Sequence, residues 1–392
     1  MIEAQRFQPL EPSEGLASLV TRLAHRLCAY HADIAAPWAG SGLSAWIALA
    51  ALARAADGAT RREIEAAIGT PGDRGLESAN AVLTWLADHP GISVAAALWV
   101  KEDVPIESTF ASELGAVGGG STPSQAECDR WVKDATDGAI ERMPVDVSAA
   151  DAVLAAAIVS AGSWTKEFEA PFTEGDPVTR STQLDDSVSI VRHNGLDFSR
   201  VVVTSDTHVD VHLFAGAAEV PPAVVFDAMF AAALGGADHL PGPELRAGDE
   251  AGCLRVTEEA AESDEEWVRL SVFPFDLRHR IDLLDPAAPV GLVDASDPNA
   301  ADLSRLSSEP VVVSAAVQES TFVFGEKGFQ ASAATAMTID ATGLPIEPAK
   351  PHRVRVVRAA HNRPHAVAVV DRASGMVLLH GWVVPESSSR RR

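Results

Sequence analysis

Helical spacing of apolar residues marks the first third of the chain. Apolar side chains three and four residues apart indicate helices with one face packed on a core. The helix that begins at Thr60 has a capping box with Glu63, and Gly69 ends it. A later helix is stopped by the turn at Asp137 and Gly138. The pattern predicts helices at 16–32, 44–56, 60–69 and 127–135.

Short β-branched and apolar runs predict strands at 92–100 and at many places after Val188. The small apolar run at 152–163 fits a buried strand or a helix by period alone, and the glycines at 118–121 indicate a flexible connection. Helices first and strands later, without strict βαβ alternation, predict an α+β fold. We find no internal repeat and no linker, so the prediction is one domain over 1–392. The later strands are predicted at 201–203, 209–214, 254–256, 268–273, 311–317, 321–324, 354–357, 366–370 and 377–379.

One segment near the C-terminus has a pattern that suits two states. Between Phe329 and Thr342, alternate positions are apolar or small, which is what a strand with one buried face needs. Its Ala, Ser and Thr content is too weakly hydrophobic to anchor a strand firmly, and Gly328 offers a hinge. Prolines follow, which is typical of an exposed loop. On pattern alone, an Ala-rich loop or an ordinary edge strand remains an alternative.

The sequence EKGFQASAAT at 326–335 is similar to the hinge of the serpin family. Other stretches resemble that family in the right order, including SGLSAWIALAALARAADGATRREIEAAIG, ALWVKEDVPIESTF, DRWVKDATDGAIERM, VLAAAIVSAGSWTKEFEAPF and NRPHAVAVVDRASGMVLLHGWVVP. The resemblance covers about 15–385 and is weakest over 200–265. It identifies the chain as a bacterial-type serpin. The implied fold is α+β, with helices, a large central sheet, two smaller sheets and an exposed reactive loop at about 326–353.

The resemblance implies a suicide-substrate inhibitor rather than an enzyme. A protease cleaves the loop, forms an acyl-enzyme, and is trapped as the loop inserts into the large sheet. Family spacing places the scissile bond at Thr342–Gly343, which would suit an elastase-like or subtilisin-like protease. Arg353–Val354 is a second candidate, which would suit a trypsin-like enzyme. The implied partner is a serine protease or, alternatively, a cysteine protease, and the protein is expected to act as a monomer without a cofactor or metal.

The same resemblance assigns roles to further residues. Phe329 stands where the family prefers Thr or Ser, so its bulk is expected to slow insertion, and Ala156 stands where the central strand usually carries Asn. These departures leave a non-inhibitory binding protein on the same fold as the alternative function. The implied hinge is Glu326, Lys327, Gly328, Phe329, Ala331, Ala333 and Thr335; the sheet-opening cluster is Ser41, Ser44, Ala156 and Gln318; and Trp164 marks the breach above the sheet.

Charge, cysteine content and the N-terminal sequence narrow the range of expected partners and cellular compartments. The 392 residues are 47% hydrophobic and carry a net charge of −24, which argues against nucleic acid and anionic membrane as partners. Three widely spaced cysteines are poor material for a disulfide framework. The N-terminal residues have no basic-then-apolar run, so no signal peptide is predicted. We therefore expect a cytoplasmic protein, although serpins are often extracellular.

Other chemistries have weaker signals. Ser163 and Lys166 match a Ser-x-x-Lys nucleophile motif, but no Lys-Thr-Gly follows. His25, Cys28 and His31 share a predicted helix without a fourth metal ligand nearby. His361 and His365 flank a proline and cannot share a helical face, and the acidic residues at 258–266 indicate a solvated turn.

Overall fold

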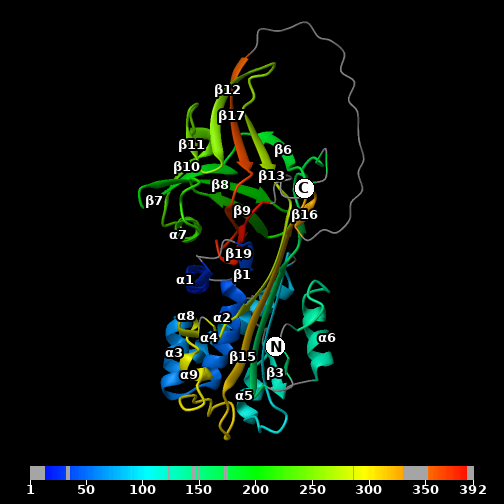
Figure 1. The fold of residues 1–392 in the computed structure, drawn as a ribbon, viewed down its shortest axis with the longest axis vertical. Helices are drawn as coiled ribbons and strands as arrows, with labels where there is room; N and C mark the ends of the chain where they lie inside the picture. Colours follow the sequence, from blue (N-terminus) through cyan, green and yellow to red (C-terminus); the bar gives the residue numbers. More distant parts are fainter. Residues whose placement is uncertain are drawn as a thin grey trace, which may run out of the picture.

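The computed structural model describes most of the chain, and Figure 1 shows its elements. The described residues are 14–31, 36–89, 91–121, 124–143, 146–147, 150–171, 173, 175–285, 287–329 and 352–385. The helices are α1 (Glu14–His31), α2 (Gly42–Ala55), α3 (Gly58–Ile68), α4 (Gly72–Ala87), α5 (Ser108–Glu113), α6 (Gln125–Ala135), α7 (Pro222–Ala233), α8 (Ala287–Val290) and α9 (Val293–Ser296), with the 3-10 turn η2 (Gly242–Glu244).

The described strands form three sheets, as the resemblance implied. The long sheet contains β3 (Gly118–Ser121), β2 (Ile92–Val100), β4 (Ala152–Ser160), β14 (Phe275–Asp282), β15 (Val313–Phe324), β16 (Gly328–Phe329) and β5 (Gly162–Ser163). The closing sheet contains β1 (Trp38–Gly40), β19 (Val377–Val383), β18 (His365–Asp371), β9 (Val209–Ala215), β8 (Leu196–Thr204), β7 (Val188–His193) and β10 (Asp238–Pro241). The upper sheet contains β11 (Glu250–Ala251), β12 (Leu254–Ala261), β17 (His352–His361), β13 (Trp267–Val272) and β6 (Val178–Gln183).

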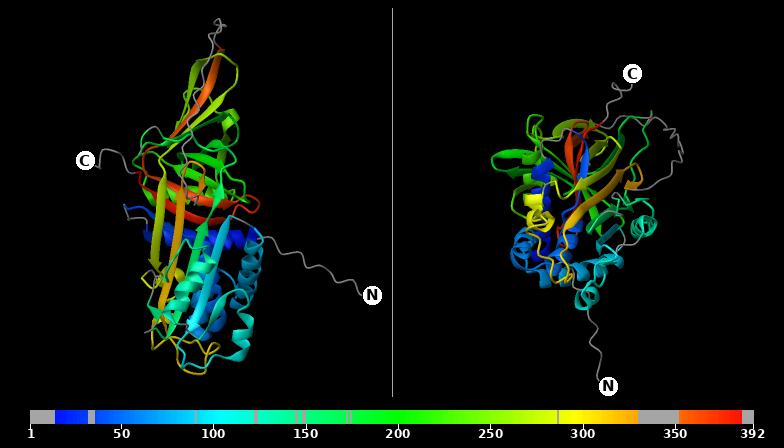
Figure 2. Two further views of the ribbon diagram at one scale, coloured as in Figure 1. Left: turned by 90° about the vertical axis from the view of Figure 1, so that its right-hand side faces the viewer. Right: turned by 60° about the horizontal axis from the view of Figure 1, so that its bottom comes forward.

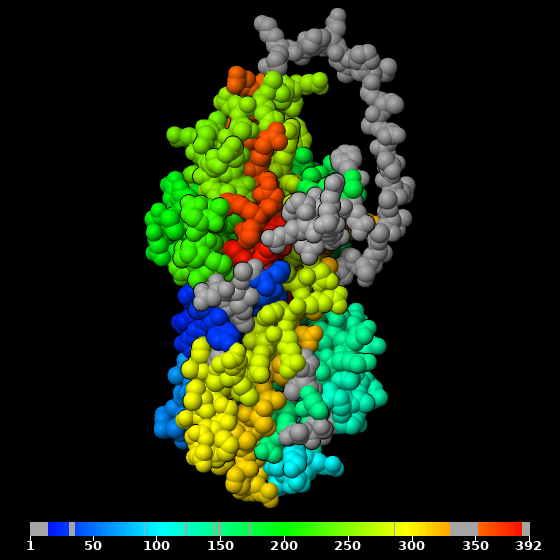
Figure 3. Space-filling view, in the orientation of Figure 1, coloured from blue at the N-terminus to red at the C-terminus, as the bar shows by residue number. Residues whose placement is uncertain are grey.

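The molecule is elongated, and the long sheet runs along its lower half (Figure 2). The closing and upper sheets make up the upper half (Figure 1), and β17 reaches the surface at the upper end (Figure 3). Helix α6 packs against the outer face of the long sheet, where Cys128 and Val132 join a buried cluster with residues of β2 and β4. The other face of the long sheet covers α2 and meets the closing sheet.

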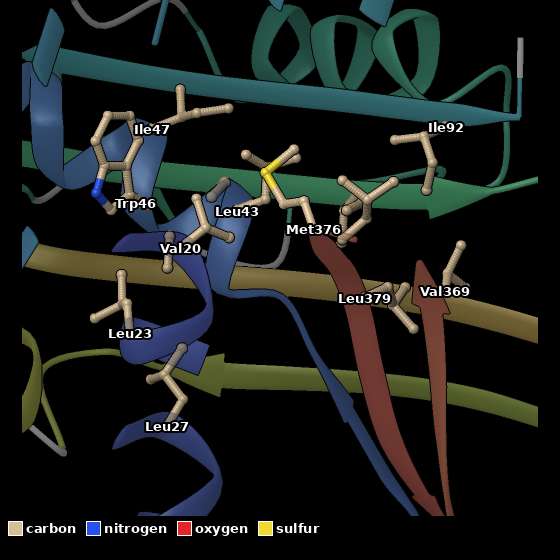
Figure 4. Close-up of a cluster of buried hydrophobic side chains, with 14 of the residues drawn as sticks. Val20, Leu23, Leu27, Leu43, Trp46, Ile47, Ile92, Val369, Met376 and Leu379 are labelled. Atoms are coloured by element: carbon tan, nitrogen blue, oxygen red, sulfur yellow. The ribbon is translucent and has the colours of Figure 1, made fainter. Parts of the chain in front are cut away.

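Helix α2 lies at the centre of the core and has buried side chains nearly all round, which explains its run of Ala and Leu. Figure 4 shows Leu43, Trp46 and Ile47 of α2 between residues of α1, such as Val20, and residues of the β18–β19 hairpin, such as Leu379. The side chain of Ser41 caps the start of α2 by accepting a hydrogen bond from the Ser44 amide. This capped end lies directly beneath the long sheet.

Several sequence predictions are confirmed and others are wrong. The four predicted helices are present, and 152–160 is strand β4 rather than a helix. The capping box of Thr60 and Glu63 is wrong, because Asp57 caps α3 and Glu63 instead accepts bonds from the amides of Val293 and Asp294. The predicted flexible connection at 118–121 is strand β3, paired with β2. The predicted strands at 311–317 and 321–324 are one strand, β15.

Candidate functional site

The predicted hinge lies at the upper end of the long sheet and is already part of it. Phe329 of β16 pairs with Phe324 of β15, and Gly328 pairs with Ser163 of β5. The carbonyl of Lys327 accepts a hydrogen bond from the amide of Trp164 at 2.9 Å. Phe329, the last described residue of the hinge, therefore belongs to a short strand that lies between β15 and β5.

An aromatic cluster holds Phe329 in this position. Its side chain is 1% exposed, and its ring centroid lies 5.2 Å from that of Trp164 and 6.2 Å from that of Phe322. The indole nitrogen of Trp164 donates to the carbonyl of Gly325 at 2.8 Å. A Cβ at position 162 would lie 2.7 Å from the Phe329 ring, so glycine is required there. Phenylalanine at the first inserting position is accommodated by these contacts.

Below β16 the long sheet has a closed seam, which we define as the line where β15 and β4 pair directly. These strands run parallel, from Val313 opposite Ala152 to Thr321 opposite Val159. Many residues along the seam are small, which limits the apolar area that joins the two strands. The small residues are Ala155, Ala156 and Ala157 of β4 and Ala315 and Ala316 of β15.

A fully bonded polar cluster lies under the seam. Gln318 of β15 is completely buried, and its amide nitrogen donates to the Ser41 carbonyl at 2.7 Å and to Ser44 Oγ at 3.0 Å. Its amide oxygen accepts from the Ser41 backbone nitrogen at 3.0 Å. Ser41 Oγ in turn donates to the carbonyl of Leu378 at 2.6 Å. Three of the four predicted cluster residues are thus joined, whereas Ala156 contributes only as the cross-strand neighbour of Gln318.

The outer face of the upper seam is open. A cavity of about 730 Å³ is lined there by Val159 and Thr321 of the seam, together with residues of the turn after α6 and of β14. Glu319, on the same outer face by strand alternation, has its carboxyl pKa raised by burial, and this effect is opposed by the nearby charges of Arg280 and Arg278. The two faces of the seam therefore differ: the upper part of one borders a cavity, and the other faces the core.

Several predicted site residues lie outside the described residues, and one prediction is wrong. Arg353–Val354, the second candidate scissile bond, lies inside β17, and Val354 is 4% exposed. A protease needs an extended, accessible peptide, so this bond is not presented to one. The predicted residues outside the described part of the chain are Ala331, Ala333, Thr335, Thr342 and Gly343.

The described residues do not support the nucleophile and metal-binding roles that the sequence raised as alternatives. Ser163 is engaged in β5, and Lys166 donates to the carbonyl of Ser181. His25 contacts Asp227 at 3.5 Å, and burial raises the pKa of the Cys28 thiol. Among the described residues, no group of three or more His, Cys, Asp and Glu side chains is arranged to hold a metal ion. None of the described helices is both long enough and apolar enough to span a bilayer.

Two histidines that sequence reasoning set aside lie together. His361, at the end of β17, and His365, at the start of β18, are buried with ring centroids 4.9 Å apart. Nδ1 of His365 hydrogen-bonds the carbonyl of Arg363 at 2.9 Å. Burial lowers the pKa of both rings, that of His365 to about 4. The proline between them prevents a shared helix but allows a tight connection between strands.

The acidic run at 258–266 is not a single solvated turn. Glu258 and Glu259 belong to β12 and form ion pairs with arginines of β17 at 3.2 and 2.7 Å. Glu266 pairs with Arg355. These contacts arise between residues about ninety positions apart, so local sequence could not predict them.

The family model that matches this chain and the first solved structures that resemble it are those of serpins. The family model described as Serpin (serine protease inhibitor) matches residues 20–207 and 247–385. Similar solved structures include the native thermophilic serpin tengpin, with 18% identity, a TM-score of 0.69 and coverage of 98% of this chain and 97% of that one. Serpin48 of the insect Tenebrio molitor has 17% identity, a TM-score of 0.66 and coverage of 94% and 98%. Human thyroxine-binding globulin has 17% identity, a TM-score of 0.68 and coverage of 96% and 99%. A search of the curated proteins found no match.

Proposed function

Because the chain belongs to the serpin family, we propose that it inhibits a serine protease by cleavage and insertion of its reactive loop, the segment from 330 to 351. The protease serine oxygen attacks the carbonyl carbon of Thr342, the bond to the Gly343 nitrogen breaks, and the released N-terminal part of the loop carries the acyl-enzyme. Insertion of that part into the seam then competes with hydrolysis of the ester. The observation that carries this proposal is the placement of β16 between β15 and β5.

The register of β16 predicts where each loop residue would go. Continuing the antiparallel pairing one residue at a time along β15 places Thr335 opposite Gln318. Continuing the pairing along β5 and β4 places the same Thr335 opposite Ala156. Gln318 and Ala156 are themselves partners across the closed seam, so the two registers agree.

The length of the seam also fits the proposed scissile bond. The same count brings Asp340 opposite Val313, the first residue of β15 and the one farthest from β16. A strand from Phe329 to Asp340 would span about 36 Å. Thr342 would then lie just beyond the lower end of the sheet, and a protease bound to it would have been carried the length of the sheet. Residues with odd numbers, beginning with the buried Phe329, would face the core.

The closed seam has features that favour exchange for an inserted strand. Ser160 Oγ and Ser320 Oγ are buried and have no hydrogen-bond partner among the described residues. An unpaired buried hydroxyl costs about 1–3 kcal/mol. An inserted strand would add two backbone ladders in place of the single ladder between β4 and β15. These terms support a closed state that is less stable than the inserted one.

The test is the melting temperature of intact protein and of protein nicked once within 336–351 by a non-target protease. We expect nicking to raise the melting temperature by tens of degrees, and a panel of small-residue-preferring proteases to yield a covalent complex that survives denaturing electrophoresis. An unchanged melting temperature would exclude insertion and leave a non-inhibitory binding protein as the function.

A further inference from the structure

We propose that β12 is a clamp that holds β17 in the upper sheet and so prevents the uncut reactive loop from entering the seam. This inference rests on the proposed function, because it concerns the same loop and seam. It assigns a conformational role to a strand pair that the trapping reaction itself does not use. The clamp consists of the pairing of β12 with β17 and of the ion pairs between them.

The reactive loop is tied at both ends. Phe329 is fixed in the long sheet, and His352 is the first residue of β17. Figure 1 shows that β17 begins at the upper end of the molecule, farther than β16 from the lower end of the seam. An uncut loop that filled the seam would have to travel down the sheet and then return past β16 to His352.

Chain length sets a limit on that return. Residues 330–340 would fill the seam, which leaves residues 341–351 for the way back. Those residues span at most about 36–40 Å when fully extended, whereas the seam strand alone spans about 36 Å. The return path is longer than the seam because β17 starts above β16. Uncut insertion therefore requires the first residues of β17 to leave the upper sheet.

The backbone of those first residues pairs with β12 alone among the described strands. β17 pairs with β13 only from Val356 to His361, whereas β12 pairs with it from His352 to Ala359. At the loop end, His352 lies opposite Ala261 and Arg355 lies opposite Glu258. Without β12, no hydrogen bond to another described strand would hold residues 352–355 of β17 in the upper sheet.

Charge reinforces the pairing. Arg353 Nε lies 3.2 Å from Glu258 Oε2, and Arg358 Nη2 lies 2.7 Å from Glu259 Oε1. Outside β12, Arg355 makes a two-pronged ion pair with Glu266 and donates to the carbonyl of Leu245, which holds the same end of β17 in addition to the clamp. Each exposed pair contributes little by itself, but together they oppose peeling of the strand from its loop end.

The test compares Glu258→Lys with the matched control Glu250→Lys. Glu258→Lys places a like charge beside Arg353 and Arg355, whereas Glu250→Lys breaks an ion pair with Arg255 at 2.8 Å that does not involve β17. Intact mass and melting temperature are followed during incubation below the melting point. We expect uncut Glu258→Lys to convert to a form with the raised melting temperature of nicked protein at least about fivefold faster than wild type. The Glu250→Lys control should convert at the wild-type rate.

The failures can be told apart. If nicking raises the melting temperature of the wild type but Glu258→Lys stays unconverted for as long as the wild type, the clamp is wrong and the proposed function stands. If nicking raises no melting temperature, the proposed function and the clamp both fail. Glu258→Gln, which removes the ion pair without adding a charge, serves if the lysine variant does not fold, and it should show a smaller acceleration in the same direction.

Discussion

The substitution Ala333→Glu tests the register of the inserted strand. Continuing the β16 pairing places residue 333 between Ile158 and Ser320, on the face that points into the core. Both neighbours are fully buried. The neighbouring position 332 falls between Val159 and Thr321, which line the open cavity on the outer face. Ser332→Glu is therefore the matched control, since it adds the same charge one residue away on the other face.

The expected effect can be worked from the cost of burying the carboxyl. A glutamate in an apolar interior without a partner is protonated, and protonating a group of ordinary pKa near 4.3 at pH 7 costs about 4 kcal/mol. If that cost falls fully on the insertion step, insertion slows by a factor of roughly 500. Hydrolysis of the acyl-enzyme would then win, and Ala333→Glu would be cleaved as a substrate.

The assay is the amount of each variant needed to abolish the activity of a fixed quantity of protease. We expect Ser332→Glu to remain within about threefold of wild type, and Ala333→Glu to be consumed without leaving a stable complex. Inhibition by Ala333→Glu at the wild-type ratio would refute the insertion argument. Equal damage from both variants would show that the register or the face assignment is wrong.

Three further predictions address the native state. Gln318→Leu leaves the backbone nitrogen and carbonyl of Ser41 and the Oγ of Ser44 without their partner. Urea unfolding should therefore show that the free energy of unfolding falls by about 3–5 kcal/mol, against about 1 kcal/mol for Ser44→Ala. Equal losses in the two variants would argue against the cluster. Phe329→Ala should destabilise intact protein by about 3–5 kcal/mol yet leave the rise in melting temperature on nicking unchanged, because the residue is seated before insertion; a changed rise would mean that Phe329 has to leave its site. The lowered pKa of His365, about 4, means that the unfolded chain binds a proton below pH 6.5 that the folded chain refuses, so stability present above pH 6.5 should fall by about 3 kcal/mol as the pH drops toward 4. His365→Gln should remove that share of the pH dependence, the exposed His352→Gln should not, and an unchanged slope in the first variant would contradict the assignment.

The sequence predicted the parts of the fold that local pattern controls. The buried helix α2 follows from its Ala- and Leu-rich composition, the strands of the closing hairpin follow from their β-branched and apolar runs, and the hinge follows from its resemblance to a family motif. Strand β3 escaped prediction because GGGS has no strand propensity, and it forms only because the edge of β2 offers backbone partners. Helix α7 was missed because, as in α2, its apolar residues continue around the helix, so its sequence shows no helical period that separates it from the apolar strand runs nearby.

The site was predicted less well than the fold, for a physical reason. Family resemblance indicated that Ser41, Ser44 and Gln318 belong together, but only the folded chain shows that Ser41 Oγ donates to the carbonyl of Leu378. The expectation that Phe329 hinders insertion was based on side-chain size alone. Its accommodation depends on Gly162 and Trp164, which lie far away in sequence, and no local pattern reveals that fit.

The parallel pairing of β4 with β15 has a consequence for biosynthesis. Residue 156 leaves the ribosome long before residue 318, its partner across the seam. The interval between the synthesis of Ser41 and that of its hydrogen-bond partner Leu378 is longer still. During this interval α2 has no finished core to enter, and β4 presents an unpaired edge on one side. Long-range pairing of this kind delays folding until most of the chain has been synthesised. The nascent protein must therefore remain soluble while its central apolar helix α2 is uncovered, and its yield in a cell should depend on chaperones that bind such surfaces.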